Sequence, residues 1–196
     1  MKNISVLVSG GGTNFQAIID NVENGYIENA RIAQVISSNP NAYALTRAEN
    51  HGIKGVVIGK KNFPDADERT DAIIKALDDE NTDLVILAGY MSVLSSKLIE
   101  AYRDKIINIH PSLIPKYCGM GMYGHHVHEA VLAGGETESG ATVHFVDEGV
   151  DTGKIILQDR VPVLEGDTPD TLAARVLEVE HKLLPKAAKM FCNGEL

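Results

Sequence analysis

The sequence predicts an α/β fold with a doubly wound, mostly parallel sheet, an antiparallel C-terminal strand pair and a long C-terminal helix. Short runs of β-branched and aliphatic residues alternate with helix-like segments over the first 110 residues. Such regular alternation is typical of parallel strands joined by right-handed crossovers. After residue 138 the pattern changes to two segments of period-two alternation, followed by one long helical segment. Together these observations indicate a Rossmann-like arrangement in a single domain, residues 1–196.

The parallel part is expected to contain five strands, each visible as a short apolar run. These strands are expected at residues 4–8, 31–37, 55–58, 83–88 and 105–110. The segments between them are expected to form helices at residues 15–25, 41–52, 68–81 and 95–103.

The C-terminal part follows a different pattern. Residues 139–149 and 153–163 alternate with period two around a glycine-flanked loop, which predicts an antiparallel pair. Thr168 has the features of a helix N-cap, with Pro169 at the first helical position. Pro185 is expected to kink or break this last helix, because proline lacks the N–H donor that a helix interior uses.

The composition excludes several classes of protein. A chain of 196 residues that is 44% hydrophobic and 23% charged suits one folded domain rather than a disordered segment. A formal charge of −9 argues against a nucleic-acid partner, which usually requires a basic face. An anionic ligand would therefore be held locally, by backbone donors rather than by the overall field.

The N-terminal segment and the cysteines indicate the compartment. The first apolar run spans about five residues, which is too short for a signal peptide or a membrane span. Cys118 and Cys192 are too few and too far apart for a disulfide framework or a metal knuckle, so we expect two free thiols. The sequence thus predicts a cytoplasmic protein with no membrane partner.

A glycine-rich segment, SGGGTN at residues 9–14, follows the first strand and opens the first helix. Glycines allow a tight turn, and the free N–H groups at a helix start form an anion site. The segment lacks the spaced third glycine of a dinucleotide fingerprint and the Lys-Ser or Lys-Thr of a P-loop. A phosphate cradle and a simple turn both remain open, and Thr13 and Asn14 serve either one.

Asn108 and His110 stand two residues apart at the end of the fifth predicted strand. Residues with this spacing project from one face of a strand, roughly 6–7 Å apart. Asp151 lies between two glycines in the loop that joins the period-two strands. Folded over the strand end, its carboxylate would orient His110 and favour the charged ring. This trio suits acyl-type transfer, while an ordinary strand end and a turn are the alternatives.

Two other kinds of chemistry fit less well. A metal could bind His125, His126, His128 and His144, but no cysteine or acidic partner stands at ligand spacing. Covalent catalysis would need a serine elbow such as G-x-S-x-G, which is absent, and Ser112 is better interpreted as a turn residue. The sequence therefore predicts no metal.

Several of these motifs resemble the phosphoribosylglycinamide formyltransferases of purine synthesis, in order and over nearly the whole chain. The resemblance is carried by SVLVSGGGTNFQAIID, LVILAGYMSVLS, IINIHPSLIPKY, GATVHFVDEGVDTGKIILQ and ARVLEVEH. NIHPSLIP with a downstream HFVDEGVDTG is typical of folate-dependent formyltransferases in general. SGGGTN and the short length select this branch of them.

The resemblance implies transfer of a formyl group from 10-formyltetrahydrofolate, as co-substrate, to the amine of glycinamide ribonucleotide. It implies that His110 is the general acid, that Asp151 orients it and raises its pKa, and that Asn108 donates to the oxyanion. The ribonucleotide would contact Gly12, Thr13, Asn14 and Glu180. The folate would contact Asn108, Met91, Ser92, Val93, Leu94, Asp147, Glu148, Gly149, Val150 and Asp151. Residues 1–110 would form the nucleotide-binding half, and residues 111–196 the folate-binding and catalytic-loop half.

The chain departs from the family pattern at three places. Ser92 stands where many relatives carry an arginine, and Arg69 falls a few residues after the position expected for a second one. Cys118 replaces a usual proline in a segment longer than the common form. These departures concern the folate's acidic tail and access to the pocket rather than the chemistry.

Other functions remain as alternatives. A formyltetrahydrofolate hydrolase uses a similar domain after an N-terminal regulatory module, for which a domain that begins at Ile4 leaves no room. A tRNA formyltransferase is disfavoured by the acidic charge and the missing C-terminal domain. A silent nucleotide-binding regulator would not need Asn108, His110 and Asp151 together. The edge of the antiparallel pair would allow a homodimer.

Overall fold

Seven strands form one sheet in the computed structural model, which describes residues 1–196. Their order across the sheet is β3-β2-β1-β4-β5-β6-β7. The parallel strands are β1 (Lys2–Val8), β2 (Ala30–Ser37), β3 (Lys54–Val57), β4 (Leu84–Leu87) and β5 (Ile106–His110). The antiparallel strands are β6 (Glu138–Phe145) and β7 (Ile155–Pro162). The predicted fold class is confirmed.

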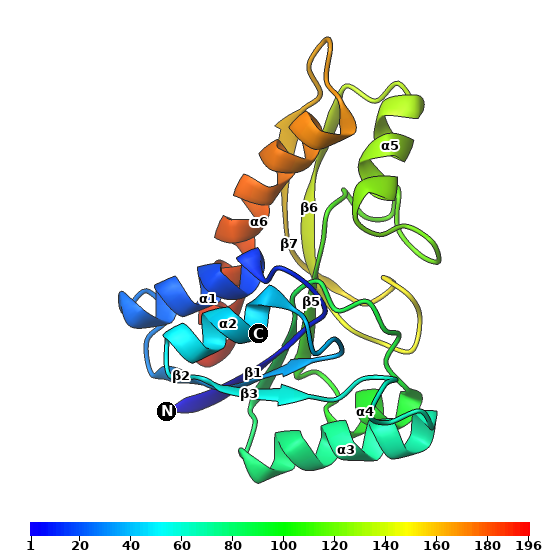
Figure 1. Ribbon diagram of the computed structural model, residues 1–196. Helices are drawn as coiled ribbons and strands as arrows, with labels where there is room; N and C mark the ends of the chain where they lie inside the picture. The colour runs from blue at the N-terminus through cyan, green and yellow to red at the C-terminus, as the bar shows by residue number, and fades with distance from the viewer.

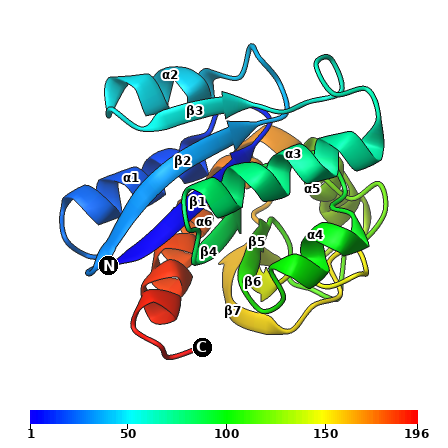
Figure 2. The ribbon, with the colours of Figure 1, turned by 90° about the horizontal axis from the view of Figure 1, so that it is seen from below.

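Six helices accompany the sheet (Figures 1 and 2). They are α1 (Thr13–Glu23), α2 (Tyr43–Asn50), α3 (Ala66–Asp79), α4 (Ser96–Ala101), α5 (His125–Ala133) and α6 (Pro169–Cys192). Thr168 caps α6 as predicted, because its side chain accepts a hydrogen bond from the Thr171 backbone N–H. No helix bounds were predicted for the histidine-rich helix α5, since residues 124–128 were considered as metal ligands or as surface or helix-face residues.

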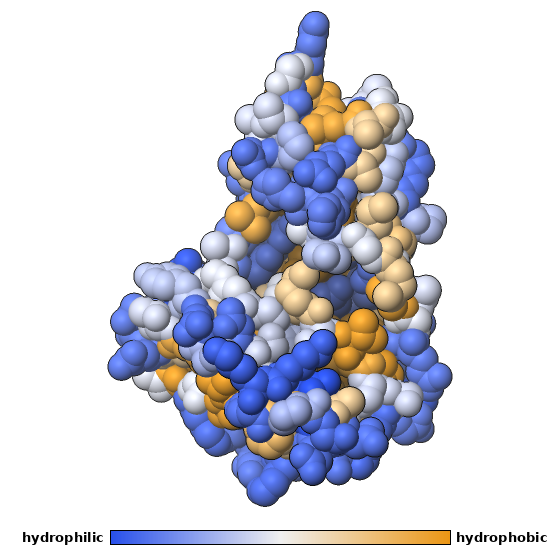
Figure 3. Space-filling view, turned by 45° about the vertical axis from the view of Figure 1, so that its right-hand side comes forward, coloured by the Kyte–Doolittle hydropathy of each residue, from blue (hydrophilic) through white to orange (hydrophobic).

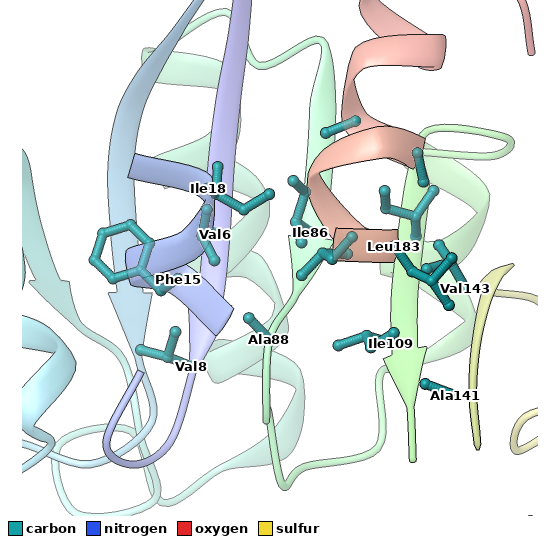
Figure 4. Packing of buried hydrophobic residues seen from close by; sticks show 14 of the residues in the cluster. Val6, Val8, Phe15, Ile18, Ile86, Ala88, Ile109, Ala141, Val143 and Leu183 are labelled. Atoms are coloured by element: carbon teal, nitrogen blue, oxygen red, sulfur yellow. The ribbon is translucent and has the colours of Figure 1, made fainter. Parts of the chain in front are cut away.

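The hydrophobic core lies in two layers, one on each face of the sheet. The larger cluster packs α1, α2, α5 and α6 against one face, and the smaller packs α3 and α4 against the other. Within β1, Val6 and Val8 point into the first cluster and Leu7 into the second. A strand that is buried on both faces shows a continuous apolar run, which is why this segment was recognisable in the sequence. Figure 4 shows Phe15 of α1 and Leu183 of α6 packing over β1, β4, β5 and β6.

Pro185 does not break α6, so a break at this position is ruled out, while a kink stays a prediction. The helix continues from Pro169 to Cys192 with Pro185 inside it. Leu183, Leu184, Ala187 and Ala188 on either side of the proline are all buried in the larger cluster. This burial outweighs the loss of one backbone hydrogen bond, because most helix stability in proteins comes from packing of the apolar face.

The strand order reverses direction between β1 and β4, because β2 and β3 lie on one side of β1 and β5 on the other. In open parallel sheets, ligands bind beyond the carboxyl ends of the strands at such a point. Figure 1 shows helix α5 above the parallel part of the sheet, next to the start of β6, the end of β7 and the start of α6. Figure 3 shows a mostly hydrophilic face with a shallow recess between the two parts.

Candidate active site

Three predicted catalytic residues meet at the end of β5. The His110 Nδ1 lies 3.6 Å from the Asp151 Oδ2, and both side chains are largely buried. Asp151 comes from the β6–β7 loop, where its backbone has a φ of 58°, a left-handed conformation that aspartate tolerates better than most residues. The loop therefore folds over the strand end, as the sequence predicted.

Asn108 has a partner that the sequence analysis did not assign to this site. The antiparallel register places His144 of β6 directly opposite Asn108. The His144 Nδ1 donates to the Phe145 carbonyl at 2.8 Å, and its Nε2 lies 3.2 Å from the Asn108 Nδ2 and 3.6 Å from the Asp151 Oδ1. In the neutral ring the Nε2 accepts a hydrogen bond from the amide, and in the charged ring it faces the carboxylate. One N–H of the Asn108 amide is thus anchored, and the second is available to a substrate oxygen.

Two backbone groups also bind His110 and Asp151. The His110 Nε2 donates to the Tyr117 carbonyl at 2.9 Å, and the Gly119 N–H donates to the Asp151 Oδ2 at 3.0 Å. Both ring nitrogens of His110 therefore face oxygen atoms. Neither backbone group could have been found from the sequence, since a carbonyl or an N–H carries no residue-type signal.

Burial sets the net pKa direction at His110. Desolvation lowers the pKa of the ring below its usual value and outweighs the Tyr117 carbonyl and the Asp151 carboxylate, which both raise it. Asp151 thus acts in the predicted direction without deciding the result. Burial by itself would raise the pKa of Asp151, but His144, His110 and the Gly119 N–H more than offset it, so the pKa is lowered. The carboxylate is held in its charged form beside His110.

The glycine-rich loop leads into α1, and the start of α1 contacts the middle of α6. Gly12 is the N-cap of α1 with a φ of 73°, and it has no side chain with which to cap the helix N–H groups. The Asn14 Nδ2 donates to the Glu180 Oε2 at 2.6 Å, although the two residues are 166 positions apart. The Asn14 Oδ1 is buried with no partner, and burial raises the pKa of Glu180. Thr13 is exposed and makes no hydrogen bond to this pair.

A cavity of about 730 Å³ lies beside the β6–β7 loop. Asp147, Glu148 and Gly149, which were predicted to contact the folate, line it together with Ile99 of α4, Arg103 just after the end of α4, and Phe145 of β6. The other residues predicted to contact the folate, which are the segment 91–94, Asn108, Val150 and Asp151, do not line this cavity. Within that segment, the Met91 side chain is 57% exposed and Val93 is 73% exposed. The Met91 N–H donates to the Ser9 Oγ at 2.9 Å, which ties this segment to the glycine-rich loop.

The remaining histidines form no metal site. No group of three or more His, Cys, Asp or Glu side chains lies close enough together to hold a metal ion. His125 instead pairs with Asp170, and the His126 Nδ1 lies 3.3 Å from the Glu129 Oε2. No helix is long and apolar enough to span a membrane.

Comparisons with known proteins place the chain in a family. A sequence model of the formyl transferase family matches residues 2–188. Phosphoribosylglycinamide formyltransferase of Haemophilus influenzae is 44% identical over 196 residues, which is 100% of this chain and 90% of that protein. The trifunctional purine biosynthetic protein adenosine-3 of Drosophila melanogaster is 43% identical over 98% of this chain but only 14% of its own length. A crystal structure of glycinamide ribonucleotide transformylase 1 from Symbiobacterium toebii has a TM-score of 0.93, is 41% identical, and covers 99% of this chain and 89% of that one.

Proposed function

This chain belongs to the formyl transferase family, and from that premise we propose that it transfers a formyl group to the amine of glycinamide ribonucleotide in purine biosynthesis. The observation that carries the proposal is the convergence of Asn108, His110 and Asp151 at the end of β5. The formyl donor is a folate, for which we propose 10-formyltetrahydrofolate. A cytoplasmic location is supported by two unpaired cysteines.

In the proposed transfer, Asn108 stabilises the developing negative charge and His110 carries the proton. The free N–H of the Asn108 amide donates to the formyl oxygen, where negative charge develops when the amine attacks. His110 takes a proton from the attacking amine and returns one to the departing folate nitrogen, so no net proton is lost. Asp151 stabilises the charged ring between these two steps. Because Asp151 is itself charged and nearly buried, it also keeps the ring in one orientation.

The ribonucleotide is assigned to the glycine-rich loop. The free N–H groups after Gly12 offer donors to its phosphate, because the start of a helix favours anions. Glu180 and Asn14 offer a carboxylate and a buried amide oxygen to the ribose hydroxyls.

The formyl end of the folate is assigned to the β6–β7 loop at Asp151, whose carboxylate lies beside His110. The cavity beside this loop is lined by Asp147, Glu148 and Gly149 but not by His110 or Asp151, so it would hold another part of the molecule. The acidic tail of the folate needs a cation, and Ser92 does not supply one. Arg69 donates to the Phe63 carbonyl at 2.7 Å and acts electrostatically on Tyr90, so its charge lies beside the segment that follows β4. We assign the tail to Arg69.

A spectroscopic assay of 10-formyltetrahydrofolate deformylation, with and without glycinamide ribonucleotide, tests the function. Turnover only with the ribonucleotide supports the proposal. Equal turnover without it would mean that water is the acceptor and that the protein is a hydrolase. No turnover in either condition would leave a binding protein.

In that assay we expect His110→Ala to lower kcat by about 10²–10⁴-fold, which is the usual contribution of a general acid or base. Asp151→Asn should lower kcat as well, because the neutral amide cannot stabilise the charged ring. Circular dichroism of both variants should match the wild type, which separates loss of chemistry from loss of fold. Near-normal kcat in His110→Ala would remove His110 from the mechanism.

A further inference from the structure

The backbone from Tyr117 to Gly119 contacts both members of the His110–Asp151 pair. The Tyr117 carbonyl accepts a hydrogen bond from the His110 Nε2, and the Gly119 N–H donates to Asp151. The position of this short segment therefore decides where the proton-carrying ring can point.

Tyr117 combines an unusual backbone conformation with a side chain that is hydrogen-bonded at its tip. Its φ is 52°, in the left-handed region that residues other than glycine rarely adopt. The phenol hydroxyl donates to the Glu136 Oε1 at 3.0 Å, and the Lys116 Nζ binds both oxygens of the same carboxylate at 3.0 and 3.1 Å. The ring also lies against the end of α5, where a Cβ added at Gly134 would come within 2.1 Å of the phenol oxygen.

We infer that Tyr117 is a positioning residue that decides which nitrogen of His110 takes part in the reaction. The inference rests on the proposed function for the catalytic role of His110. A hydrogen bond at one imidazole nitrogen fixes the tautomer and leaves the other nitrogen for chemistry. Since the Nε2–H is committed to the Tyr117 carbonyl, the Nδ1 is the nitrogen that exchanges a proton with the substrates.

The position of Asp151 supports the assignment. The Nδ1 faces the Asp151 Oδ2 at 3.6 Å, which is longer than a hydrogen bond. A proton taken up at Nδ1 is stabilised by the carboxylate but is not locked to it. The two oxygens also compete, because the carboxylate favours the Nδ1–H tautomer and the Tyr117 carbonyl favours the Nε2–H tautomer. Tyr117 therefore keeps a lone pair on Nδ1 in the neutral ring.

The test is ¹⁵N NMR of histidine-labelled protein, with the His110 signals assigned by their loss in His110→Ala. Wild type should show the Nε2–H tautomer in the neutral form. Tyr117→Phe keeps the ring and removes the hydroxyl that binds Glu136. It should raise the Nδ1–H population, lower the pKa of His110, and reduce kcat/KM about threefold to tenfold, the equivalent of one ordinary hydrogen bond.

Gly134→Ala is the second variant, because it displaces the phenol while the hydroxyl stays. Gly134 has a φ of −75° and a ψ of −6°, which alanine adopts freely, so the variant should fold. It should change the His110 signals in the same direction as Tyr117→Phe. Tyr123→Phe is the control, since its phenol lies in the same segment and is 50% exposed, and it should change nothing.

Unchanged tautomer and titration of His110 in both variants would overturn the inference, as would a wild-type ring in the Nδ1–H form. The NMR readout does not depend on turnover. If the wild type is inactive in the deformylation assay but the two variants change the His110 tautomer as expected, the proposed function is rejected. The positioning of the His110 ring by Tyr117 is then still supported.

Discussion

The orientation of the Asn108 amide is fixed by one contact, the hydrogen bond to His144. A free amide rotates and offers either its oxygen or its nitrogen, but the hydrogen bond to His144 fixes the Nδ2 on the inner side. The His144 ring is fixed in turn by the Phe145 carbonyl. A donor aligned before the reaction stabilises developing charge without reorganising.

Substitutions at these two residues should separate donation from orientation. Asn108→Ala should lower kcat about 10²–10³-fold, as expected for a lost oxyanion donor, with little change in the KM for the ribonucleotide. His144→Phe should lower kcat less, by about tenfold, because the amide remains but loses its anchor. Steady-state kinetics at saturating folate measure both, with His126→Phe on the exposed side of α5 as the control. A kcat within tenfold of wild type in Asn108→Ala would exclude its role as donor.

His128, which was considered as a metal ligand, is buried in α5 without a hydrogen-bond partner at its Nδ1. It is 4% exposed, and burial lowers its pKa to about 4. The native protein therefore binds fewer protons than the unfolded chain between pH 6.5 and about 4. Stability should rise with pH across this window and be lost as the pH falls through it.

Urea denaturation at pH 7 and pH 5 should reveal this dependence. We expect wild type to lose about 1–2 kcal/mol on acidification through His128 alone. His128→Leu removes the titrating group without breaking a hydrogen bond, so it should lose less stability over the same interval. His126→Gln, an exposed histidine on the same helix, should behave like wild type. Equal pH dependence in wild type and His128→Leu would contradict the assignment.

At the scale of elements, the turn between β1 and α1 depends on one glycine of three. Gly12 has a positive φ, and a Cβ there would lie 2.6 Å from the Ala44 Cβ of α2. Gly10 and Gly11 have ordinary φ values and nothing within 4 Å of an added Cβ. The close approach of α2 to the loop therefore requires glycine at position 12 only.

Gly12→Ala should destabilise the protein by about 2 kcal/mol, from the left-handed backbone and the contact with Ala44. It should also weaken binding of the ribonucleotide, because the loop can no longer approach the start of α1 in the same way. Gly10→Ala is the matched control and should have wild-type stability and affinity. Thermal unfolding and isothermal titration with glycinamide ribonucleotide measure the two effects. Equal stability of the two variants would show that the turn is less constrained than the contact with α2 implies.

The β5–β6 pairing is the second element that makes the site. Its register places His144 opposite Asn108 and Thr142 opposite His110. A shift by one residue would turn each side chain to the other face of the sheet. The Thr142 hydroxyl donates to the Ser112 carbonyl at 2.7 Å and accepts from the Ile114 N–H at 3.2 Å. These bonds hold the chain that leaves β5 against the sheet.

At the scale of the whole molecule, the two halves of the chain share one core. The larger cluster contains residues of β1, α1 and β4 from the first half and of α5, β6 and α6 from the second. Separating the halves would expose this surface. The division at residue 110 therefore describes ligand binding and stays a prediction.

Unfolding should accordingly be a single cooperative transition. Far-UV circular dichroism and tyrosine fluorescence, in a chain without tryptophan, should give the same urea midpoint. Two separate midpoints would mean that the nucleotide-binding half folds independently. Addition of glycinamide ribonucleotide at about 100 times its Kd should raise the free energy of unfolding by about 2.7 kcal/mol without splitting the transition.

The homodimer also belongs to this scale and stays a prediction. The free edges of the sheet are β3 and β7. β7 carries Asp159, Arg160 and Pro162, and charged residues and proline on an edge strand oppose pairing with another sheet. Light scattering at several protein concentrations distinguishes a monomer from a dimer.

The sequence by itself determined the fold class, the parallel strands and the three residues that we propose as catalytic. These features are local, because β1 is a buried apolar run, Thr168 caps its own helix, and Asn108 and His110 share one face of one strand. Helix α5 was not predicted because its histidines interrupt a weak apolar pattern. Pro185 does not break α6 because its neighbours are buried.

Only the tertiary structure decided which groups contact the proposed site residues. His144 meets Asn108 through strand register, Glu180 meets Asn14 across 166 positions, and Tyr117 reaches His110 through its backbone carbonyl. Contacts between distant segments depend on packing, and backbone groups are the same in every residue. Neither leaves a pattern along the chain that a sequence can display.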